Sequence, residues 1–441
     1  MKYPKIDNTL FIQNRAGLVK HLKPKSLALF NSNDIMPKSA DGVRPFVQHT
    51  DIFYLSGIDQ EESILLLCPE AQEEKHREIL FIRETNEKLA VWEGQKYTVE
   101  EAREISGIST VYWTSRFQDI FRSLAFESDH IWLNTNEHSR ADLSVETRDE
   151  RFVKWCRQAF PLHKYERLAP ILHNLRAVKS SIEADLISHA CAITGQAFRR
   201  LLGFIRPGVW EFEIEAEIWH EFVRNRSRGP AYESIIASGA DSCVLHYVKN
   251  DKQCKAGDLV LMDFGCEYTN YAADLTRTVP VSGKFTPRQK QVYNAVLRVQ
   301  RAAIDLLRPG NTIKQYHKSV GEIMERELIA LGLLDAGEVE KQKQDKDAYE
   351  ENPLYKKYFM HGTSHHLGLD VHDYGNRYRP FEAGMVLTCE PGIYIKDEGF
   401  GIRLENDILV TTDGPVDLMA DIPIEADEIE DLMGKFSDVL P

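Results

Sequence analysis

Two short stretches of the 441-residue chain, Ala256-Gly-Asp-Leu-Val-Leu-Met-Asp263 and Ala383-Gly-Met-Val-Leu-Thr-Cys-Glu390, follow one pattern. In each, an Ala-Gly pair precedes an apolar run that ends on a carboxylate six positions after the glycine. Short apolar runs between turn signals predict buried β-strands. A second acid follows in the next strand-like segment, Asp274 in the first case and Glu405 in the second. We interpret the pattern as an internal repeat of two similar halves, whose paired acids meet in the middle.

The helices of the two halves carry the same start and stop signals. Ser180 with Glu183, and Thr286 with Gln289, form capping boxes that start a helix. Both helices stop at an Arg-Pro-Gly sequence, and the two stops lie 102 residues apart. The pattern predicts helices from 180 to the first stop, at 211–224, from 286 to 307 and at 312–331, strands at 232–238, 258–264, 271–281, 364–372, 385–390 and 401–411, and a charged, exposed excursion at 332–358.

The first part of the chain alternates short apolar runs with helical stretches, which indicates an α/β domain. A chain of this length exceeds one ordinary core, so we expect two domains, residues 1–173 and 174–441. The first shows no glycine-rich phosphate loop and no cluster of histidine and cysteine. In it we predict strands at 26–30, 52–55, 63–68, 79–83 and 131–133, and helices at 10–22, 97–105 and 145–160.

Composition limits the classes of function. The chain is 43% hydrophobic and 28% charged, which is typical of a soluble globular protein. A net charge of −14 disfavours a nucleic-acid partner, because phosphates require a basic surface. The N-terminus has no apolar core of a signal peptide, and no run approaches the ~20 apolar residues of a membrane span. Seven cysteines, an odd number without a CxxC pair, favour reduced thiols in the cytoplasm.

The segment Met360–Asp373 holds four of the fifteen histidines, at 361, 365, 366 and 372. Imidazole binds metals and moves protons near neutral pH. The four acids of the repeat lie in apolar contexts, where an ionised carboxylate is costly unless it is paired. Ion pairs with Arg277 and Arg403 would be a purely structural explanation, but they do not explain why the acid positions repeat. We therefore favour a two-metal centre in which carboxylates bridge the metals and one imidazole completes the ligand set.

Oxygen ligands with a single nitrogen favour manganese, with cobalt, iron or zinc as alternatives. Cys389, beside Glu390, should point to the opposite face of its strand and belong to the core. The spacing of His361 and His365 matches the helical zincin motif, but a glycine follows His361 where that motif has a glutamate, so we reject that interpretation. Two metals hold a bridging hydroxide and polarise a carbonyl or phosphoryl oxygen, which predicts a hydrolase.

These residues resemble the Xaa-Pro aminopeptidases (aminopeptidase P), in the M24 group of metallopeptidases with the pita-bread fold, which also includes prolidase and creatinase. The matching stretches in the second domain are Leu245-His-Tyr247, Leu261-Met-Asp-Phe-Gly265, Asp274-Leu-Thr-Arg-Thr278, His361-Gly-Thr-Ser-His365, Gly368-Leu-Asp-Val-His-Asp373, Glu390-Pro-Gly-Ile-Tyr394 and Gly401-Ile-Arg-Leu-Glu405. The first domain, with Phe53-Tyr-Leu-Ser-Gly57, is similar to the smaller creatinase-like α/β domain of the same family.

The resemblance implies a role for each matching residue. The metal ligands would be Asp263, Asp274, His365, Glu390 and Glu405, holding two divalent ions, with manganese preferred. Glu390 would also be the acid/base partner of the bridging hydroxide. The groups around the substrate would be His246, His361, His372, Tyr394 and Arg403, all but Tyr394 also counted as catalytic. The implied reaction releases the N-terminal residue from peptides with proline in second position.

Alternatives remain. Prolidase, a dipeptidase, would share the metal centre, although Thr363-Ser364 before His365 favours the aminopeptidase. A non-catalytic binding protein on the same fold would have lost metal ligands, and all five are present. His366 stands where relatives often carry tryptophan, and we expect it to line the pocket or lie at the surface. The resemblance also implies a homodimer or homotetramer, in which Trp92 could reach a neighbour's site.

Overall fold

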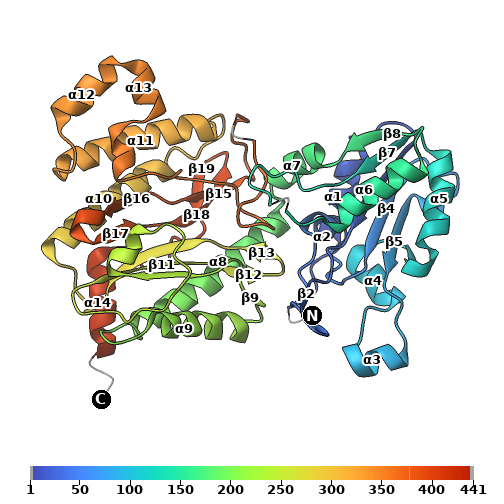
Figure 1. Ribbon diagram of the computed structural model, residues 1–441, viewed down its shortest axis with the longest axis horizontal. Helices are drawn as coiled ribbons and strands as arrows, with labels where there is room; N and C mark the ends of the chain where they lie inside the picture. Colours follow the sequence, from blue (N-terminus) through green and yellow to red (C-terminus); the bar gives the residue numbers. More distant parts are fainter. Residues whose placement is uncertain (1–2, 143, 377, 438–441) are drawn as a thin grey trace. The chain divides into compact units, whose positions relative to one another are not determined.

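The computed structural model describes residues 3–142, 144–376 and 378–437 (Figure 1). The chain divides into two compact units, with the division between Arg176 and Ala177. Among the described residues, every helix is too short or too polar to span a bilayer. All seven cysteines are buried free thiols.

The first unit is built on a six-stranded mixed sheet in the order β6-β5-β4-β1-β7-β8. Its central strands, β1 and β4, are buried along their whole length, which explains why they read as continuous apolar runs. The strands of the sheet are β1 (Ser26–Asn31), β4 (Ile64–Leu67), β5 (Glu78–Ile82), β6 (Thr110–Trp113), β7 (His130–Leu133) and β8 (Lys164–Arg167). A small hairpin joins β2 (Pro37–Ser39) to β3 (Gly42–Val43).

Helices cover this sheet, and one of them corrects the sequence analysis. Residues 52–55, predicted as a strand, lie inside α2 (Thr50–Ser56), where every residue after Thr50 is buried. A short apolar run does not distinguish a strand from a buried helix. The helix begins at His49, whose ring accepts from the Asp51 N–H, and ends at Gly57 in the left-handed conformation. The other helices are α1 (Thr9–Val19), α3 (Glu87–Glu93), α4 (Val99–Ser106), α5 (Phe117–Glu127), α6 (Arg148–Ala159) and α7 (Ala169–Ala177).

The second unit contains the predicted repeat. In the first half, α8 (Ser181–Leu202) and α9 (Glu211–Arg224) precede a sheet in the order β10-β11-β14. In the second half, α10 (Pro287–Ile304) and α11 (Ile313–Ala330) precede a sheet in the order β15-β18-β19. Both predicted capping boxes form, at Ser180 and at Thr286. The same order of helix, helix and antiparallel sheet in each half explains why the motifs occur twice.

The strands of the second unit are β9 (Gly229–Pro230), β10 (Ile235–Ser238), β11 (Leu259–Phe264), β12 (Cys266–Tyr268), β13 (Tyr271–Ala272), β14 (Leu275–Pro280), β15 (Val386–Cys389), β16 (Gly392–Ile395), β17 (Phe400–Arg403), β18 (Asn406–Thr411) and β19 (Gly414–Asp417). The predicted strand at 271–281 is therefore two strands, and so is the one at 401–411. The excursion at 332–358 holds α12 (Ala336–Gln344) and α13 (Lys346–Glu351), and α14 (Ala426–Ser437) ends the described chain.

The predicted strand at 364–372 is wrong. This segment is irregular, and only His366 makes an isolated bridge, to Leu387. Its backbone bonds instead hold a loop: Asp373 N–H donates to the His366 carbonyl (2.8 Å). Gly368 makes the close approach needed there, because a Cβ on it would lie 2.0 Å from an oxygen of Asp373.

Candidate metal centre

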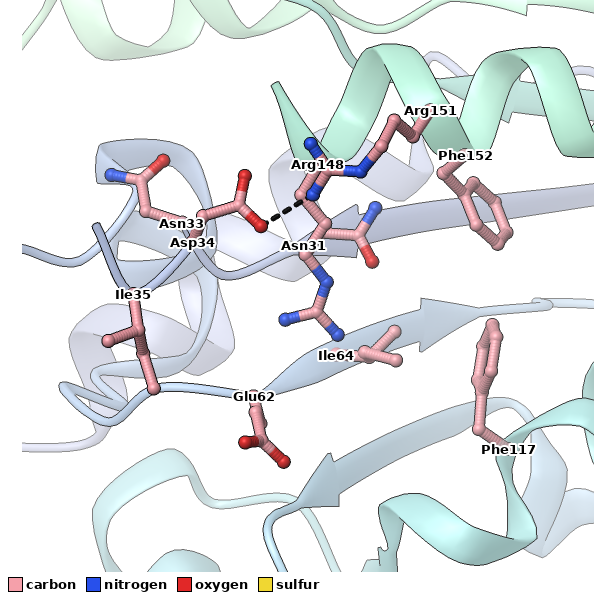
Figure 2. A pocket seen from close by; sticks show the side chains of 10 residues that line it. All are labelled: Asn31, Asn33, Asp34, Ile35, Glu62, Ile64, Phe117, Arg148, Arg151 and Phe152. Atoms are coloured by element: carbon pink, nitrogen blue, oxygen red, sulfur yellow. Dashed lines mark hydrogen bonds and ion pairs between the residues drawn. The ribbon is translucent and has the colours of Figure 1, made fainter. Parts of the chain in front are cut away.

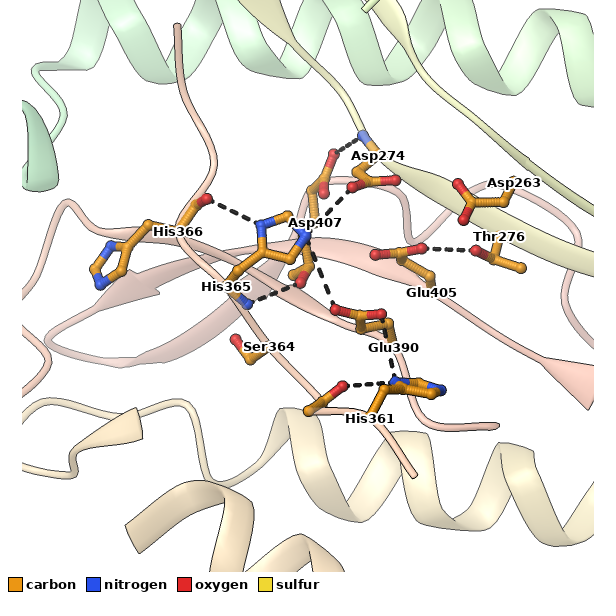
Figure 3. A network of polar contacts seen from close by, with 12 residues as sticks. Asp263, Asp274, Thr276, His361, Ser364, His365, His366, Glu390, Glu405 and Asp407 are labelled. Carbon is orange, nitrogen blue, oxygen red and sulfur yellow. Dashed lines mark hydrogen bonds and ion pairs between the residues drawn. The ribbon is translucent and has the colours of Figure 1, made fainter. Parts of the chain in front are cut away.

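The two halves of the second unit meet along the segments that carry the second acid of each half. Asp274 directly precedes β14, and Glu405 directly precedes β18. The Glu405 N–H donates to the Thr276 carbonyl (3.1 Å), and the Thr276 hydroxyl donates to Glu405 Oε2 (2.6 Å). The Asp274 N–H donates to Asp407 Oδ2 (2.9 Å). The second acids are thus held side by side, each on a strand of a different half (Figure 3).

The first acids come from the preceding strands, together with the histidine-rich loop. Asp263 lies within β11, and Glu390 directly follows β15. The loop runs along β15: Thr388 N–H donates to the His365 carbonyl (3.0 Å), and Glu390 N–H donates to the Thr363 carbonyl (2.9 Å). The repeat of acids and the loop are therefore parts of one site.

His365 faces the acids with one particular nitrogen. Its Nε2 lies 3.4 Å from Asp274 Oδ2 and 3.8 Å from Glu390 Oε1. Ligand atoms of Asp274, His365 and Glu405 all lie within 4.8 Å of one another. His365 Nδ1 lies 3.0 Å from the His366 carbonyl, which can only accept, so Nδ1 carries the hydrogen. This leaves Nε2 directed at the acids, the orientation of a metal ligand that is held by its other nitrogen.

Asp263 joins the same cluster through contacts with Arg403 and Tyr232. Arg403 Nη2 donates to Asp263 Oδ2 (2.5 Å). The Tyr232 hydroxyl lies 2.6 Å from Asp263 Oδ1 and 2.5 Å from Asp274 Oδ1, so it bridges the two carboxylates. Arg277, the other candidate counter-ion, instead donates to backbone carbonyls, including that of Glu405 (2.8 Å). Of the two candidate arginines, only Arg403 pairs with an acid of the cluster, so ion pairing alone does not explain four carboxylates at this site.

The pKa shifts in the cluster indicate that an added positive charge would stabilise its carboxylates. Burial, with the neighbouring acids, raises the pKa of Glu390 to about 7 and that of Glu405 well above its usual range. Burial likewise raises the pKa of Asp263. For His365, burial acts in the opposite direction, but the hydrogen bond to Asp274 and the charge of Glu390 raise its pKa to about 9. Bound divalent cations would stabilise the ionised form of these crowded carboxylates.

The donor set itself fits such cations. Four carboxylates and one imidazole nitrogen are the ligands of hard or intermediate divalent metals. No thiol competes: as predicted, Cys389 is part of the core, where the Tyr316 hydroxyl donates to its sulfur (3.4 Å). The structure therefore brings Asp263, Asp274, His365, Glu390 and Glu405 together in one cluster.

A chain of hydrogen bonds flanks the cluster. Arg403 Nη1 donates to the Tyr394 hydroxyl (2.9 Å), and this hydroxyl lies 2.7 Å from His361 Nε2. His361 Nδ1 lies 2.7 Å from the Gly362 carbonyl and 3.8 Å from Glu390 Oε2. Since a carbonyl only accepts, Nδ1 carries the hydrogen and Nε2 accepts from Tyr394. Burial and the charge of Arg403 lower the pKa of His361 to about 3, so its ring is neutral.

The remaining predicted histidines are less buried. The exposed His372 ring packs edge-on against His365, with 4.5 Å between ring centroids. His246 is exposed on the loop after β10, near enough for its charge to lower the pKa of His361.

His366 departs from the sequence expectation of a pocket-lining or surface position. It is only 4% exposed, and Figure 3 shows its ring directed away from the acids. The bridge to Leu387 turns the ring to this side, where it packs closely over Gly375. Its contribution to the site is its backbone carbonyl.

Three contributors escaped the sequence analysis: Tyr232, Thr276 and Asp407. Asp407 is fully buried on β18 and accepts from the Cys191 thiol (3.3 Å) as well as from the Asp274 backbone. Burial and the charge of Asp274 raise its pKa well above the usual range. Of the three, only Asp407 gave a signal, an acid two positions after Glu405 in an apolar strand.

Comparison with known proteins places this geometry in a family. The model of metallopeptidase family M24 matches residues 185–412, and that of the aminopeptidase P N-terminal domain matches residues 11–132. The chain belongs to metallopeptidase family M24. Among its relatives is the Xaa-Pro aminopeptidase of Escherichia coli (strain K12), 36% identical over 437 residues, with 96% of this chain and 97% of the relative covered. Human Xaa-Pro aminopeptidase 3 is 32% identical, with 92% of this chain and 80% of the relative covered.

Solved structures of M24 metallopeptidases confirm the fold class. An Escherichia coli aminopeptidase P in complex with substrate superimposes with a TM-score of 0.87 at 33% identity, covering 99% of this chain and 100% of the other. Aminopeptidase PepP of Pseudomonas aeruginosa gives a TM-score of 0.88 at 30% identity, covering 98% and 99%. The two-part α/β architecture predicted from the sequence, a small domain before a duplicated metallopeptidase domain, is thus correct.

Proposed function

We propose that this M24 metallopeptidase is an Xaa-Pro aminopeptidase, which hydrolyses the N-terminal peptide bond of peptides with proline in second position. One observation carries the proposal. The donors Asp263, Asp274, His365, Glu390 and Glu405 converge in a chain that aligns along nearly its whole length with Xaa-Pro aminopeptidases. A non-catalytic binding protein would not need the complete set of metal donors, and burial makes ionisation of these carboxyl groups unfavourable.

Divalent ions held by these five residues would supply Lewis-acid polarisation of the peptide carbonyl and activation of a water. We assign the proton transfers to Glu390, because its carboxyl group lies 3.8 Å from a ring nitrogen of both His361 and His365, where it can accept a proton from an activated water and return it. His361 is kept neutral and fixed, because its Nδ1 donates to the Gly362 carbonyl and its Nε2 accepts from Tyr394, and we assign its ring to the substrate site beside Glu390. Arg403 holds both Asp263 and Tyr394 in position.

The exposed His246 and His372 are the groups we assign to substrate contact, together with Tyr394 and Arg403. The preference for proline has a physical basis. An Xaa-Pro bond is a tertiary amide without an N–H, so the peptidase must recognise the ring by shape and not through a hydrogen bond to that nitrogen. Two metal ions, with manganese preferred, follow from the oxygen-rich donor set. A cytoplasmic location, supported by seven free cysteines, and a homo-oligomer of two or four chains complete the proposal.

The decisive experiment measures cleavage of Xaa-Pro peptides of two to five residues by chelator-treated protein that is reloaded with manganese, cobalt, zinc or iron. We expect release of the N-terminal residue from peptides of three residues and longer, and no release when alanine replaces proline. Exclusive cleavage of dipeptides would instead identify a prolidase. No cleavage with any metal, although metal binds, would leave only the non-catalytic alternative.

A further inference from the structure

The first unit contains a cavity that is unrelated to the metal centre. Its volume is about 560 Å³, which lies within the range of small-ligand sites. It lies between the end of β1, the start of β4 and the first turns of α5 and α6 (Figure 2). Its lining includes Asp34, Glu62, Ile64, Phe117, Arg148 and Phe152.

Arg148 is the cation at the middle of this cavity. Its guanidinium reaches into the space between Asp34 and Glu62 (Figure 2). It donates a single hydrogen bond, from Nη1 to the Ser32 hydroxyl (2.7 Å), and makes no ion pair with any described carboxylate. Burial lowers the pKa of Arg148 even though nearby carboxylates act to raise it. An arginine that is half-buried and short of acceptors gains from a bound carboxylate.

The other arginine of the cavity already has a carboxylate partner. Arg151 Nη2 donates to Asp34 Oδ1 (2.5 Å), and its Nη1 donates to the Glu146 carbonyl (3.0 Å). An incoming anion would therefore bind to Arg148.

Glu62 supplies a negative charge on the opposite side of the cavity. Its backbone has φ +56°, a left-handed conformation that costs energy for any residue other than glycine. Nε of the nearest cation, Arg83, lies 3.7 Å from Glu62 Oε1. Arg83 donates its hydrogen bonds to Glu61 (2.9 Å) and Glu93 (2.7 Å) instead. The Glu62 carboxylate therefore makes an ion pair with Arg83 but receives no hydrogen bond from it, so its oxygens can still accept from a ligand. A ligand contact at this position would explain why the strained backbone is kept.

The far end of the cavity is apolar. Phe117 and Phe152 lie with their ring centroids 5.9 Å apart, and Ile64 is 4% exposed beside them. In Figure 2 these three side chains lie on the side away from Asn33 and Asp34. The cavity therefore combines a separated cation and anion with an apolar surface, and its two arginines balance its two acids.

We propose that this cavity binds a free α-amino acid with an apolar side chain. The ligand carboxylate pairs with Arg148, the ligand ammonium pairs with Glu62, and the side chain packs against Phe117, Phe152 and Ile64. A lining without net charge but with separated charges favours a zwitterion over a simple anion or cation, since either of these would satisfy only one of the two groups. The inference is independent of the proposed peptidase activity, because no metal donor lines the cavity.

The test measures binding of L-leucine and L-phenylalanine to the full-length, metal-loaded protein by titration calorimetry. We expect saturable binding that weakens at least tenfold, about the effect of one charge-assisted contact, in Arg148→Gln and in Glu62→Gln. The matched control is Arg157→Gln, an exposed arginine of the same helix α6 outside the cavity, which should bind as the parent does.

Ligand variants test the same contacts without changing the protein. Leucine amide lacks the carboxylate and N-acetyl-leucine lacks the ammonium, so each should bind at least about tenfold more weakly than leucine. Equal affinity of leucine and leucine amide, or undiminished binding to folded Arg148→Gln, would overturn the proposal. Absence of saturable binding at concentrations up to about 10 mM would do so as well.

Discussion

Removal of metal should make the second unit less stable as the pH rises from about 4.5 to about 7. In the metal-free fold, burial raises the pKa of Glu390 from 4.5 to about 7. In this window the folded protein holds a proton that the unfolded chain releases, so raising the pH favours unfolding. The pKa values of Asp263 and Glu405 are also raised, and they act in the same direction.

The size of the effect follows from the shift. A difference of about 2.5 units at Glu390 corresponds to about 3 kcal/mol, at about 1.4 kcal/mol per unit. For a unit of this size, that loss lowers the unfolding temperature by about 6 to 12 °C. Bound metal should remove the dependence, because a divalent cation stabilises the ionised carboxylates that the empty cluster destabilises.

Calorimetric unfolding of chelator-treated and metal-loaded protein at about pH 5.5 and about pH 8 measures how the unfolding temperature depends on pH in each form. The metal-free Glu390→Gln variant carries a permanently neutral side chain, so it should exceed the metal-free parent in stability by about 3 kcal/mol at the higher pH and by only about 1 kcal/mol at the lower one. Glu340→Gln, on the exposed surface of α12, is the control and should match the parent at both. A metal-free Glu390→Gln that is no more stable than the parent at high pH would refute the reasoning.

Three further outcomes are expected. Glu390→Ala should lower kcat by at least about a thousandfold, measured on an Xaa-Pro tripeptide; a near-parental rate would contradict the assigned role. Tyr394→Phe removes the hydroxyl between Arg403 and His361 and should lower kcat by about ten- to a hundredfold with unchanged metal content. Glu211→Ala leaves four donors without their acceptor, including the Tyr247 hydroxyl, and should lower the free energy of unfolding in urea by about 3 kcal/mol.

The cluster of carboxylates could be predicted from the sequence because its signal repeats. An acid at the end of an apolar strand is unfavourable alone, and the same placement at Asp263 and Glu390 has few explanations other than a shared cation. Tyr232 and Asp407 could not be predicted in the same way. Asp407 contacts the Asp274 backbone only because strands of the two halves meet, and Tyr232 reaches Asp274 only because segments of the first half fold together. No spacing along the chain encodes either contact.

The fold was predicted best where local chemistry is decisive. The capping boxes at Ser180 and Thr286 bond within one turn of their helices, so they form whatever surrounds them. Segment 52–55 was misassigned because a short apolar run fits both a strand and a buried helix. Segment 364–372 was misassigned because its conformation is set by a partner distant in sequence. For the second segment, the decisive partner is β15, which lies beside the loop and gives it a single bridge instead of a ladder.

The two adjacent histidines contribute to the cluster in different ways, His365 through its ring and His366 through its backbone carbonyl. His365 directs Nε2 at the acids because its Nδ1 hydrogen is taken by the carbonyl of His366. Since that carbonyl belongs to the backbone, the contact does not require histidine at position 366. The His366 ring lies on the far side, buried against Gly375, so its identity matters for packing of the loop and not for the ligand set. Another side chain at position 366 that packs against Gly375 should therefore preserve the orientation of the His365 ring.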